Sequence, residues 1–238
     1  IEIKLYRSSD YIVVVTDSFK SYMERYEINS KKIVVVKNGV NAVRFASIDK
    51  DQSLLRKLKL ENKFIISYTG TIGLAHSLDF ILDCASIIKD DSIHFIFQGD
   101  GAVKQNLINK AKKLRLKNVT FLNPVGRENV VKYLSISDVA LVNLKKNQTF
   151  ESVIPSKIFE NVAMKKPILL GLQGESKKLI ESYKVGLSFI PQNNNSFIKT
   201  LSKIKNFKNE NFERNCEKMI DDFDRKKMAK KLLKFISK

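Results

Sequence analysis

The chain has 238 residues, of which 43% are hydrophobic and 29% are charged, and its formal net charge is +18. This length and balance exclude a disordered chain and predict one large or two small globular domains. No apolar run approaches the roughly 18–20 residues of a membrane span, and the opening segment IEIKLYRSSD is too charged for a signal peptide.

Short apolar runs alternate with amphipathic stretches along the chain. The runs are predicted strands, at residues 11–16, 32–38, 64–70, 93–99, 119–125, 139–144, 167–172 and 186–191. Helical stretches lie between them, such as residues 77–89 and 102–116. Because the strands are apolar throughout rather than alternating, we expect them to be buried on both faces of a parallel sheet. The sequence therefore predicts an α/β fold with a Rossmann-like, doubly wound parallel sheet that binds ligands beyond the carboxyl ends of its strands.

The run NGVNAVRFASIDKD, residues 38–51, interrupts this alternation. Its opening Asn-Gly is a turn signal, and we interpret the run as an interdomain hinge. The two strands before it are too few for an independent sheet. We therefore predict that residues 1–41 are the tail of a truncated N-terminal domain, that residues 42–215 form the Rossmann-like domain, and that residues 216–238 form a C-terminal helix.

The positive charge predicts an anionic partner, such as a phosphorylated substrate or anionic lipid. The basic residues are not interleaved with aromatics and belong to no nucleic-acid motif, so we expect no nucleic acid partner. The last predicted helix has one apolar stripe beneath a basic face, formed by Ala229, Leu232, Leu233 and Ile236. This stripe suits packing on a neighbouring domain or peripheral contact with a membrane.

The cysteines, Cys84 and Cys216, and the histidines, His76 and His94, lack the spacing of a metal site. We expect reduced, partly buried thiols, and neither a metal nor a cofactor.

Two loops that follow predicted strands are rich in glycine. Gly70 and Gly73 flank a turn between a strand and a helix, where backbone N–H groups can close on an anion. An ordinary turn is the alternative. The second loop, Gly99-Asp100-Gly101, imitates a dinucleotide fingerprint, but Lys104 occupies the third glycine position. This loop therefore favours a Rossmann-type topology more than it favours NAD.

The segment PSKIFE, residues 155–160, predicts the start of a helix with Ser156 as its N-cap. Ser156 and Glu160 lie on one stripe of this helix, and Lys157 lies three residues before Glu160. A lysine at a helix N-terminus attracts a phosphate, and a carboxylate one turn deeper suits neutral hydroxyls such as those of a ribose. An internal Lys157–Glu160 surface pair is the alternative.

These segments resemble a known family. The motif ESVIPSKIFENVAMKKPIL, together with YTGTIGLAHSLDFIL, QGDG and VTFLNPVGRENV, is similar to the nucleotide-sugar domain of retaining GT-B glycosyltransferases of family 4. The resemblance covers nearly the whole chain. It is strongest to bacterial transferases of surface polysaccharides such as capsule and O-antigen, including N-acetyl-L-fucosamine transferases.

The resemblance implies a role for each part of the chain. The first 41 residues would belong to an acceptor domain, the central domain would be the C-terminal half of a GT-B fold, and the last helix would pack back toward the N-terminal domain. Glu160 would hold the donor ribose, the diphosphate would bind on the glycine loop at Gly70, Thr71 and Gly73, and the nucleobase would bind at Val125, Gly126 and Arg127. We expect the sugar at Glu151, Ser152 and Val153, and we place Lys157 beside Glu160 in catalysis and Ser156 at the diphosphate.

Several positions depart from the family pattern. Ser152 stands in place of the first motif glutamate, Thr71 and His76 stand in place of two basic residues, and Pro155 stands in place of a glycine. We hypothesise that Lys157, with the Ser156 hydroxyl and the helix terminus, replaces the missing cations.

The expected activity is transfer of a sugar, with retention, from a nucleoside diphosphate sugar, most simply a UDP-sugar, to a polysaccharide or lipid-linked acceptor. We expect a cytoplasmic protein that contacts the inner membrane face peripherally. We expect the chain by itself to bind donor weakly or not detectably and to transfer no sugar. The alternatives are a non-catalytic nucleotide-sugar-binding subunit, a UDP-sugar 2-epimerase of GT-B architecture and, more distantly, an NAD-dependent dehydrogenase.

Overall fold

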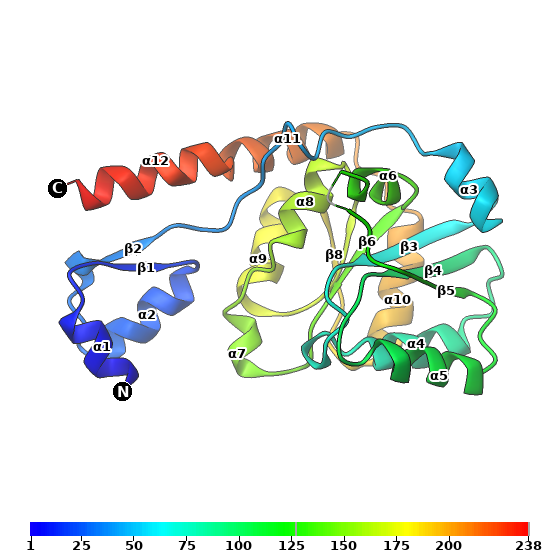
Figure 1. Cartoon of the computed structure of the whole chain (residues 1–238), viewed down its shortest axis with the longest axis horizontal. Helices are drawn as coiled ribbons and strands as arrows, with labels where there is room; N and C mark the ends of the chain where they lie inside the picture. Colours follow the sequence, from blue (N-terminus) through cyan, green and yellow to red (C-terminus); the bar gives the residue numbers. More distant parts are fainter. Residues whose placement is uncertain (127, 238) are drawn as a thin grey trace.

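The computed structural model describes residues 1–126 and 128–237. Its main sheet has six strands within this range, in the order β5-β4-β3-β6-β7-β8 (Figure 1). The strands are β3 (Phe64–Thr69), β4 (Ile93–Gln98), β5 (Val119–Leu122), β6 (Val139–Asn143), β7 (Ile168–Gly171) and β8 (Gly186–Ser188). Every pair of neighbours is parallel. The chain reverses its direction of winding between β5 and β6, so the predicted doubly wound α/β fold is confirmed.

Helices cover both faces of this sheet. One layer packs with β3 and β4 and contains α4 (Leu78–Ile87), α5 (Lys104–Lys113) and α10 (Asn194–Lys205). The opposite layer contains α6 (Val130–Ser135), α8 (Lys157–Ala163), α9 (Gly174–Tyr183) and α11 (Phe212–Asp222). The helix α3 (Gln52–Leu58) packs Leu54 and Leu55 against β3 and β4. The short helix α7 (Gln148–Glu151) precedes α8. Within the described residues, no helix combines the length and apolar character that crossing a bilayer requires.

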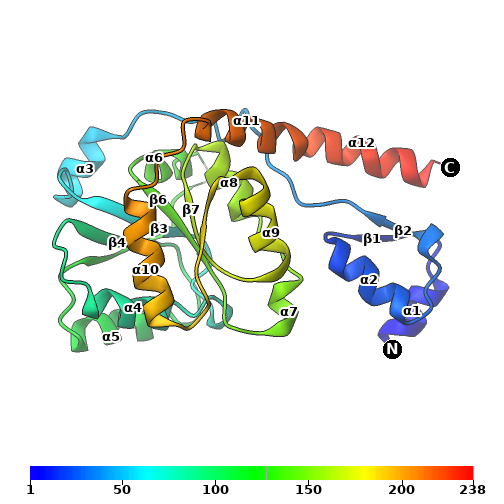
Figure 2. The ribbon, with the colours of Figure 1, turned by 180° about the vertical axis from the view of Figure 1, so that it is seen from behind.

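The N-terminal segment forms a small unit of its own. It contains α1 (Glu2–Ser8), β1 (Ile12–Val14), α2 (Asp17–Arg25) and β2 (Ile33–Val35). The two strands are parallel and pair only with each other in the described structure, with Ile12 opposite Ile33. Both views show this unit beside the large sheet rather than within it (Figures 1 and 2). Its side chains form a separate hydrophobic cluster.

The stretch predicted as one C-terminal helix is two helices. The chain leaves α11 at Phe223, and Asp224 begins α12 (Arg225–Ile236) by accepting hydrogen bonds from two backbone N–H groups of its first turn. Phe223 is buried against Phe159, with ring centroids 4.9 Å apart, which fixes the chain at the junction. Beyond it, α12 extends toward the N-terminal unit, where the rings of Phe235 and Tyr11 lie 5.4 Å apart (Figure 1).

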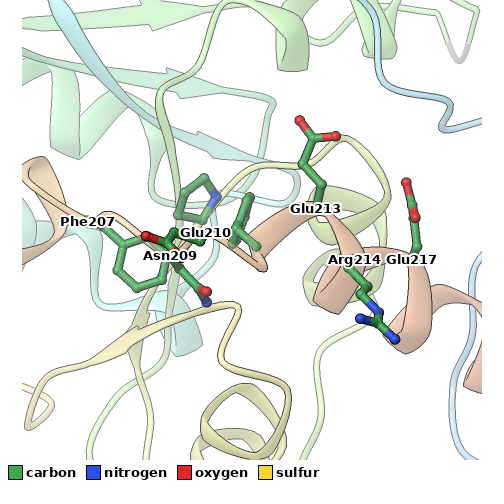
Figure 3. Close-up of a pocket in the computed structure, with 8 residues that line it drawn as sticks. Phe207, Asn209, Glu210, Glu213, Arg214 and Glu217 are labelled. Atoms are coloured by element: carbon green, nitrogen blue, oxygen red, sulfur yellow. The ribbon is translucent and has the colours of Figure 1, made fainter.

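A hollow of about 690 Å³ lies at the amino-end edge of the sheet, beside Pro167 at the start of β7 (Figure 3). Glu210, Glu213, Arg214 and Glu217 line it. Lys165 neutralises two of these carboxylates, since its Nζ lies 2.5 Å from Glu213 and 3.3 Å from Glu217. Ligands of open parallel sheets bind at the opposite, carboxyl-end edge, so this hollow is not the predicted site.

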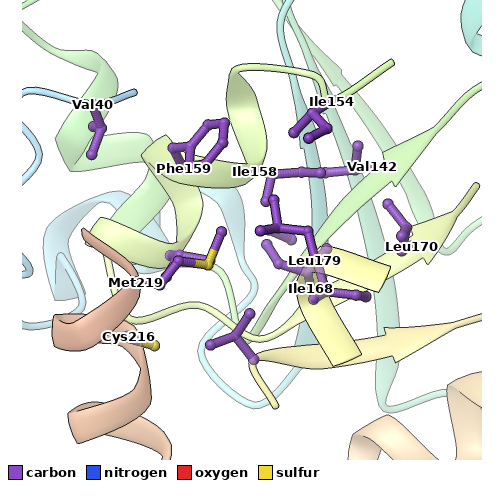
Figure 4. Packing of buried hydrophobic residues seen from close by; sticks show 14 of the residues in the cluster. Val40, Val142, Ile154, Ile158, Phe159, Ile168, Leu170, Leu179, Cys216 and Met219 are labelled. Carbon is purple, nitrogen blue, oxygen red and sulfur yellow. The ribbon is translucent and has the colours of Figure 1, made fainter. Parts of the chain in front are cut away.

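The core between the sheet and α8 determines how α8 begins. Ile158, Phe159 and Val162 are fully buried against β6, β7 and α11 (Figure 4). Burial of a large apolar side chain contributes about 1.5–3 kcal/mol, so this face fixes the rotation of the helix. The polar residues Lys157 and Glu160 are therefore held on the other side, toward the carboxyl ends of the strands.

Candidate functional site

The loops after β3 and β4 are packed backbone against backbone. Gly99 has φ +138°, and a β-carbon added to it would lie 1.9 Å from the carbonyl oxygen of Gly70. A β-carbon on Gly101, with φ +155°, would lie 2.4 Å from the carbonyl oxygen of Ile72. The backbone N–H of Ile72 donates to the carbonyl of Asp100 at 2.7 Å. The Gly-Asp-Gly motif thus positions the loop at Gly70–Gly73. Its glycines are explained by this backbone packing, without any need for NAD binding.

Lys157 reaches this glycine loop from α8. A β-carbon on Gly70 would lie 3.2 Å from Lys157 Nζ, so the ammonium group lies beside the strand end. The same Nζ lies 3.8 Å from the ring centroid of Tyr68, in a cation–π contact. Nζ is buried and has no hydrogen-bond partner, so no hydrogen bond joins it to Glu160. Because buried charges are normally paired, the N–H donors of this lysine are left open by the described residues.

The surroundings of Lys157 tune its proton affinity. Burial lowers the pKa of Lys157 to about 8, and the Glu160 carboxylate partly opposes this shift. Burial, with the nearby Lys157, lowers the pKa of His76 to about 4, so His76 is neutral at physiological pH. His76 Nδ1 lies 3.4 Å from the carbonyl oxygen of Asn143 and must donate the hydrogen there. Lys157 is therefore the cationic side chain in the contact group that it forms with Tyr68, Gly70 and His76.

Tyr68 and Asn143 support this arrangement. The Tyr68 hydroxyl donates to the carbonyl of Thr71 at 2.5 Å, and the Tyr68 ring supports Lys157. The Asn143 amide donates to the carbonyl of His76 at 2.8 Å. Tyr68 is next to the last residue of β3 and Asn143 is the last residue of β6, so the sheet itself holds the loop in place.

Ser156 and Glu160 occupy their predicted positions on α8. Ser156 is the N-cap residue and is exposed, but its hydroxyl caps no backbone N–H of the helix. Glu160 lies in the first turn and is half-buried, rather than turned fully into the interior. The hydroxyl and the carboxylate therefore remain available beside Lys157.

A second hollow, of about 320 Å³, lies at the carboxyl ends of β3, β4 and β5. Gly70 and Thr71 line one side, and Val125 lines the other with Pro124 and Val130. The structure thus brings predicted phosphate-binding and nucleobase-binding residues into one hollow. Gly73 lies at the far end of the loop, where a β-carbon would be within 3.9 Å of the His76 ring. Gly126 is exposed beside Val125, and Arg127 lies outside the described residues.

Lys104 has a structural role beside this hollow, where it binds the carbonyl of the lining residue Gly99. Its Nζ donates to the carbonyls of Gly99 at 2.8 Å and Leu122 at 3.1 Å, and to Asn123 Oδ1 at 3.0 Å. Lys104, which stands in place of the third glycine of a dinucleotide-binding motif, therefore joins the ends of β4 and β5.

The predicted sugar-binding residues are held mainly by α9. Ser176 Oγ donates to the carbonyl of Val153 at 2.6 Å. The backbone of Glu151 packs so closely on Gly174 that a β-carbon there would lie 2.1 Å from the Glu151 carbonyl oxygen. Glu151 is exposed, whereas Ser152 and Val153 are half-buried.

Sequence reasoning missed Tyr68, Gln98 and Asn143. Each is a polar residue at or next to the last position of its strand. A buried polar group at the carboxyl edge of a parallel sheet needs a partner, but β3 and β4 contain other polar residues, so this signal is too weak to single out Tyr68 and Gln98.

The family model described as "Glycosyl transferases group 1" matches residues 49–221. WbjE of Pseudomonas aeruginosa, a probable glycosyltransferase, is 23% identical over 192 residues, which cover 79% of this chain and 47% of WbjE. WcaI of Escherichia coli (strain K12), a candidate glycosyl transferase of colanic acid biosynthesis, is 26% identical over 158 residues, covering 65% of this chain and 39% of WcaI. The chain thus spans about half or less of these curated relatives.

Solved structures share the fold. The crystal structure of Anabaena Alr3699/HepE in complex with UDP superposes with a TM-score of 0.84 at 14% identity, covering 99% of this chain and 66% of that one. A glycosyltransferase from Rickettsia africae gives a TM-score of 0.80 at 19% identity, covering 98% and 65%. The family match extends over more than half of the chain and includes both the glycine loop and the Lys157–Glu160 segment. The chain therefore belongs to the group 1 glycosyltransferases.

Proposed function

We propose that this chain is the donor-binding part of a glycosyltransferase that acts on a nucleoside diphosphate sugar, with UDP as the nucleotide. The sugar would pass, with retention of configuration, to a polysaccharide or lipid-linked acceptor. The observation that carries the proposal is the unpaired ammonium group of Lys157, buried beside Gly70. A diphosphate would supply the anionic partner that this group lacks.

The chemistry requires charge stabilisation at the leaving group. When the glycosidic bond to the donor breaks, negative charge develops on the nucleoside diphosphate. Lys157, the Ser156 hydroxyl and the backbone N–H groups at the start of α8 would stabilise this charge, without a metal. Glu160 would accept hydrogen bonds from the ribose hydroxyls. Glu151, Ser152 and Val153 would contact the sugar, and Val125, Gly126 and Arg127 the base.

The finer assignment rests on resemblance and on relatives. The sequence resembles N-acetyl-L-fucosamine transferases, and WcaI is described as a candidate in colanic acid biosynthesis. HepE has been crystallised with UDP and with UDP-glucose. We place the acceptor site in an N-terminal domain to which residues 1–41 would belong, with residues 42–215 binding the donor. The basic surface suits a lipid-linked diphosphate at the cytoplasmic membrane face.

The alternatives make different demands. A non-catalytic subunit would bind the donor and need a separate chain for the acceptor. A 2-epimerase would need additional catalytic acids and histidines between the domains. Neither alternative gives the unpaired Lys157 a role in transfer, so the transfer assay on a Lys157 variant separates them from the proposal.

Replacement of Lys157 tests the proposal directly. Removal of one donor to developing leaving-group charge typically raises the barrier by about 3–4 kcal/mol. We expect Lys157→Ala to lower sugar transfer at least about a hundredfold in the complete enzyme, measured with a labelled donor sugar. Lys165→Ala, at the other end of α8, is the matched control, because Lys165 pairs with Glu213 and Glu217 instead. Transfer by Lys157→Ala within about threefold of the unchanged enzyme would refute the role of Lys157.

A further inference from the structure

The floor of the hollow beside the glycine loop contains a buried amide without a partner. Gln98 is the last residue of β4 and is 1% exposed. Its Nε2 is buried without a hydrogen-bond partner among the described residues, and Gln98 lines the hollow with Gly70, Thr71 and Val125. Buried side-chain donors in folded proteins are normally satisfied, so an unpaired one at a cavity indicates a ligand that supplies the acceptor.

Other unpaired buried atoms lie in the same part of the molecule. Lys157 Nζ, Ser77 Oγ and Asn143 Oδ1 lack partners as well, and these residues lie at the start of α8, the start of α4 and the end of β6. Lys157 contacts the glycine loop from one side, at Gly70. Gln98 lines the same hollow as Gly70, Thr71 and Val125. Both open polar groups are therefore close to the loop on which the diphosphate is expected.

The shape and chemistry around Gln98 suit a planar base. Pro124, Val125 and Val130 form an apolar wall, which can cover the face of a flat ring. Thr69 and Gln98 are directly paired across β3 and β4, so both side chains rise on the same face of the sheet. To present an N–H to a ligand, the Gln98 carboxamide would turn about its last bond, which is a soft torsion. The described lining residues include the carboxylate of Asp100 and no lysine or arginine, which favours a neutral ring over a second phosphate.

We propose that Gln98 is a specificity-determining residue that donates a hydrogen bond to a ring carbonyl of the donor nucleobase. The inference rests on the proposed function and deepens it, because it assigns recognition of a carbonyl-bearing pyrimidine, uracil, to a side chain. Cytosine carries an amino group where uracil has its second carbonyl, and an N–H donor facing that position rejects the amino group.

The test is a titration of the isotope-labelled chain with UDP, CDP and inorganic pyrophosphate, followed by NMR up to millimolar ligand. The unchanged chain is expected to bind UDP more tightly than CDP. Gln98→Met is expected to weaken UDP binding roughly tenfold, to remove the preference over CDP and to leave pyrophosphate binding unchanged. Gln105→Met, an exposed glutamine on α5 that bonds Asn109, is the matched control and should behave like the unchanged chain.

A second readout guards against a misfolded variant. Removal of an unpaired buried donor should not lower the melting temperature of the ligand-free chain, so Gln98→Met should melt at or above the unchanged chain. Equal UDP and CDP affinities in the unchanged chain, unchanged UDP binding in Gln98→Met, or a clearly lower melting temperature would overturn the assignment to Gln98. Failure of the complete enzyme to bind any of the three ligands would instead overturn the proposed function.

Discussion

Lys157 shows how one residue can be both costly and useful. Its ammonium group is buried without a hydrogen bond, and burial lowers its pKa to about 8. The Tyr68 ring offsets part of that cost, because a cation over an aromatic face gains about 1–2 kcal/mol when water is excluded. The group remains protonated near neutral pH, yet only a small rise in pH removes the charge. The lowered pKa of Lys157 should therefore make ligand binding depend on pH.

We expect UDP affinity to fall as pH rises above about 8. The pKa of free Lys157 is lowered to about 8, and a bound diphosphate favours the protonated form, so binding above this pH must take up a proton. The affinity should then fall by up to tenfold per pH unit, measured by titration above about pH 7, where the terminal phosphate is fully ionised. Lys157→Gln should bind weakly and show no such slope. A slope that persists in Lys157→Gln would assign the titration to another group.

At the scale of the elements, the sequence predicts the strands well, but it predicts poorly where strands and helices end. Apolar runs identify the eight strands of the described residues, but the expected burial on both faces does not hold for all of them. In β1, Val13 is 47% exposed, and the residues of β5 are only half-buried. The strand predicted at residues 119–125 ends at Leu122, since Pro124 has no N–H to continue the ladder. The break at Phe223 and Asp224 inside the predicted C-terminal helix depends on packing against Phe159, which no local pattern contains.

In the candidate site too, residues marked by a local sequence pattern could be predicted, and residues marked only by contacts in space could not. Residues Gly70, Lys157 and Glu160 could be predicted because motif spacing places them at a strand end and on one helix face. Gln98 and Tyr68 could not, since their importance comes from neighbours in space: the hollow for one and the lysine above the ring for the other.

The interlocked glycine loops make a stability prediction. Gly99→Ala should destabilise the chain by at least about 1–2 kcal/mol, because its φ of +138° disfavours a side chain and the added carbon would meet the Gly70 carbonyl oxygen at 1.9 Å. Urea denaturation measures this change. Gly73→Ala is the control, since its nearest contacts would be ordinary ones at 3.8 and 3.9 Å. Equal midpoints for the two variants would show that the loops can separate without cost.

At the scale of the whole molecule, a carboxylate joins the two units. Glu175, in the first turn of α9, accepts hydrogen bonds from the backbone N–H of Ser18 at 3.0 Å and from its hydroxyl at 2.6 Å. Ser18 lies in the first turn of α2, where backbone N–H groups attract negative charge. The next residue of α9, Ser176, bonds the carbonyl of Val153 in the predicted sugar-binding segment. The start of α9 therefore contacts both the N-terminal unit, through Glu175, and the predicted sugar-binding segment, through Ser176.

Loss of this carboxylate should loosen the N-terminal unit. Glu175→Ala is expected to speed amide hydrogen exchange at Ser18 roughly tenfold or more, because hydrogen bonds to a charged group contribute about 1.5–3 kcal/mol. Glu181→Ala, on the same helix, is the control, since Glu181 contacts Lys177 and Ser188 within the large unit. Equal exchange rates at Ser18 in both variants would show that the contact carries no stability.

The chain passes between the two units twice, and both passages meet at one point. The backbone N–H of Val40 donates to Phe223 at 3.1 Å, and that of Arg225 donates to Val40 at the same distance. A β-carbon on Gly39 would lie 2.3 Å from the Phe223 carbonyl oxygen, so the passages are in direct contact. Sliding or separating the units would break these bonds, whereas turning about the shared point would preserve them and break the Ser18–Glu175 contact instead. The crossing is therefore the position at which the chain would bend if the two units moved, and the Ser18–Glu175 contact opposes that bending.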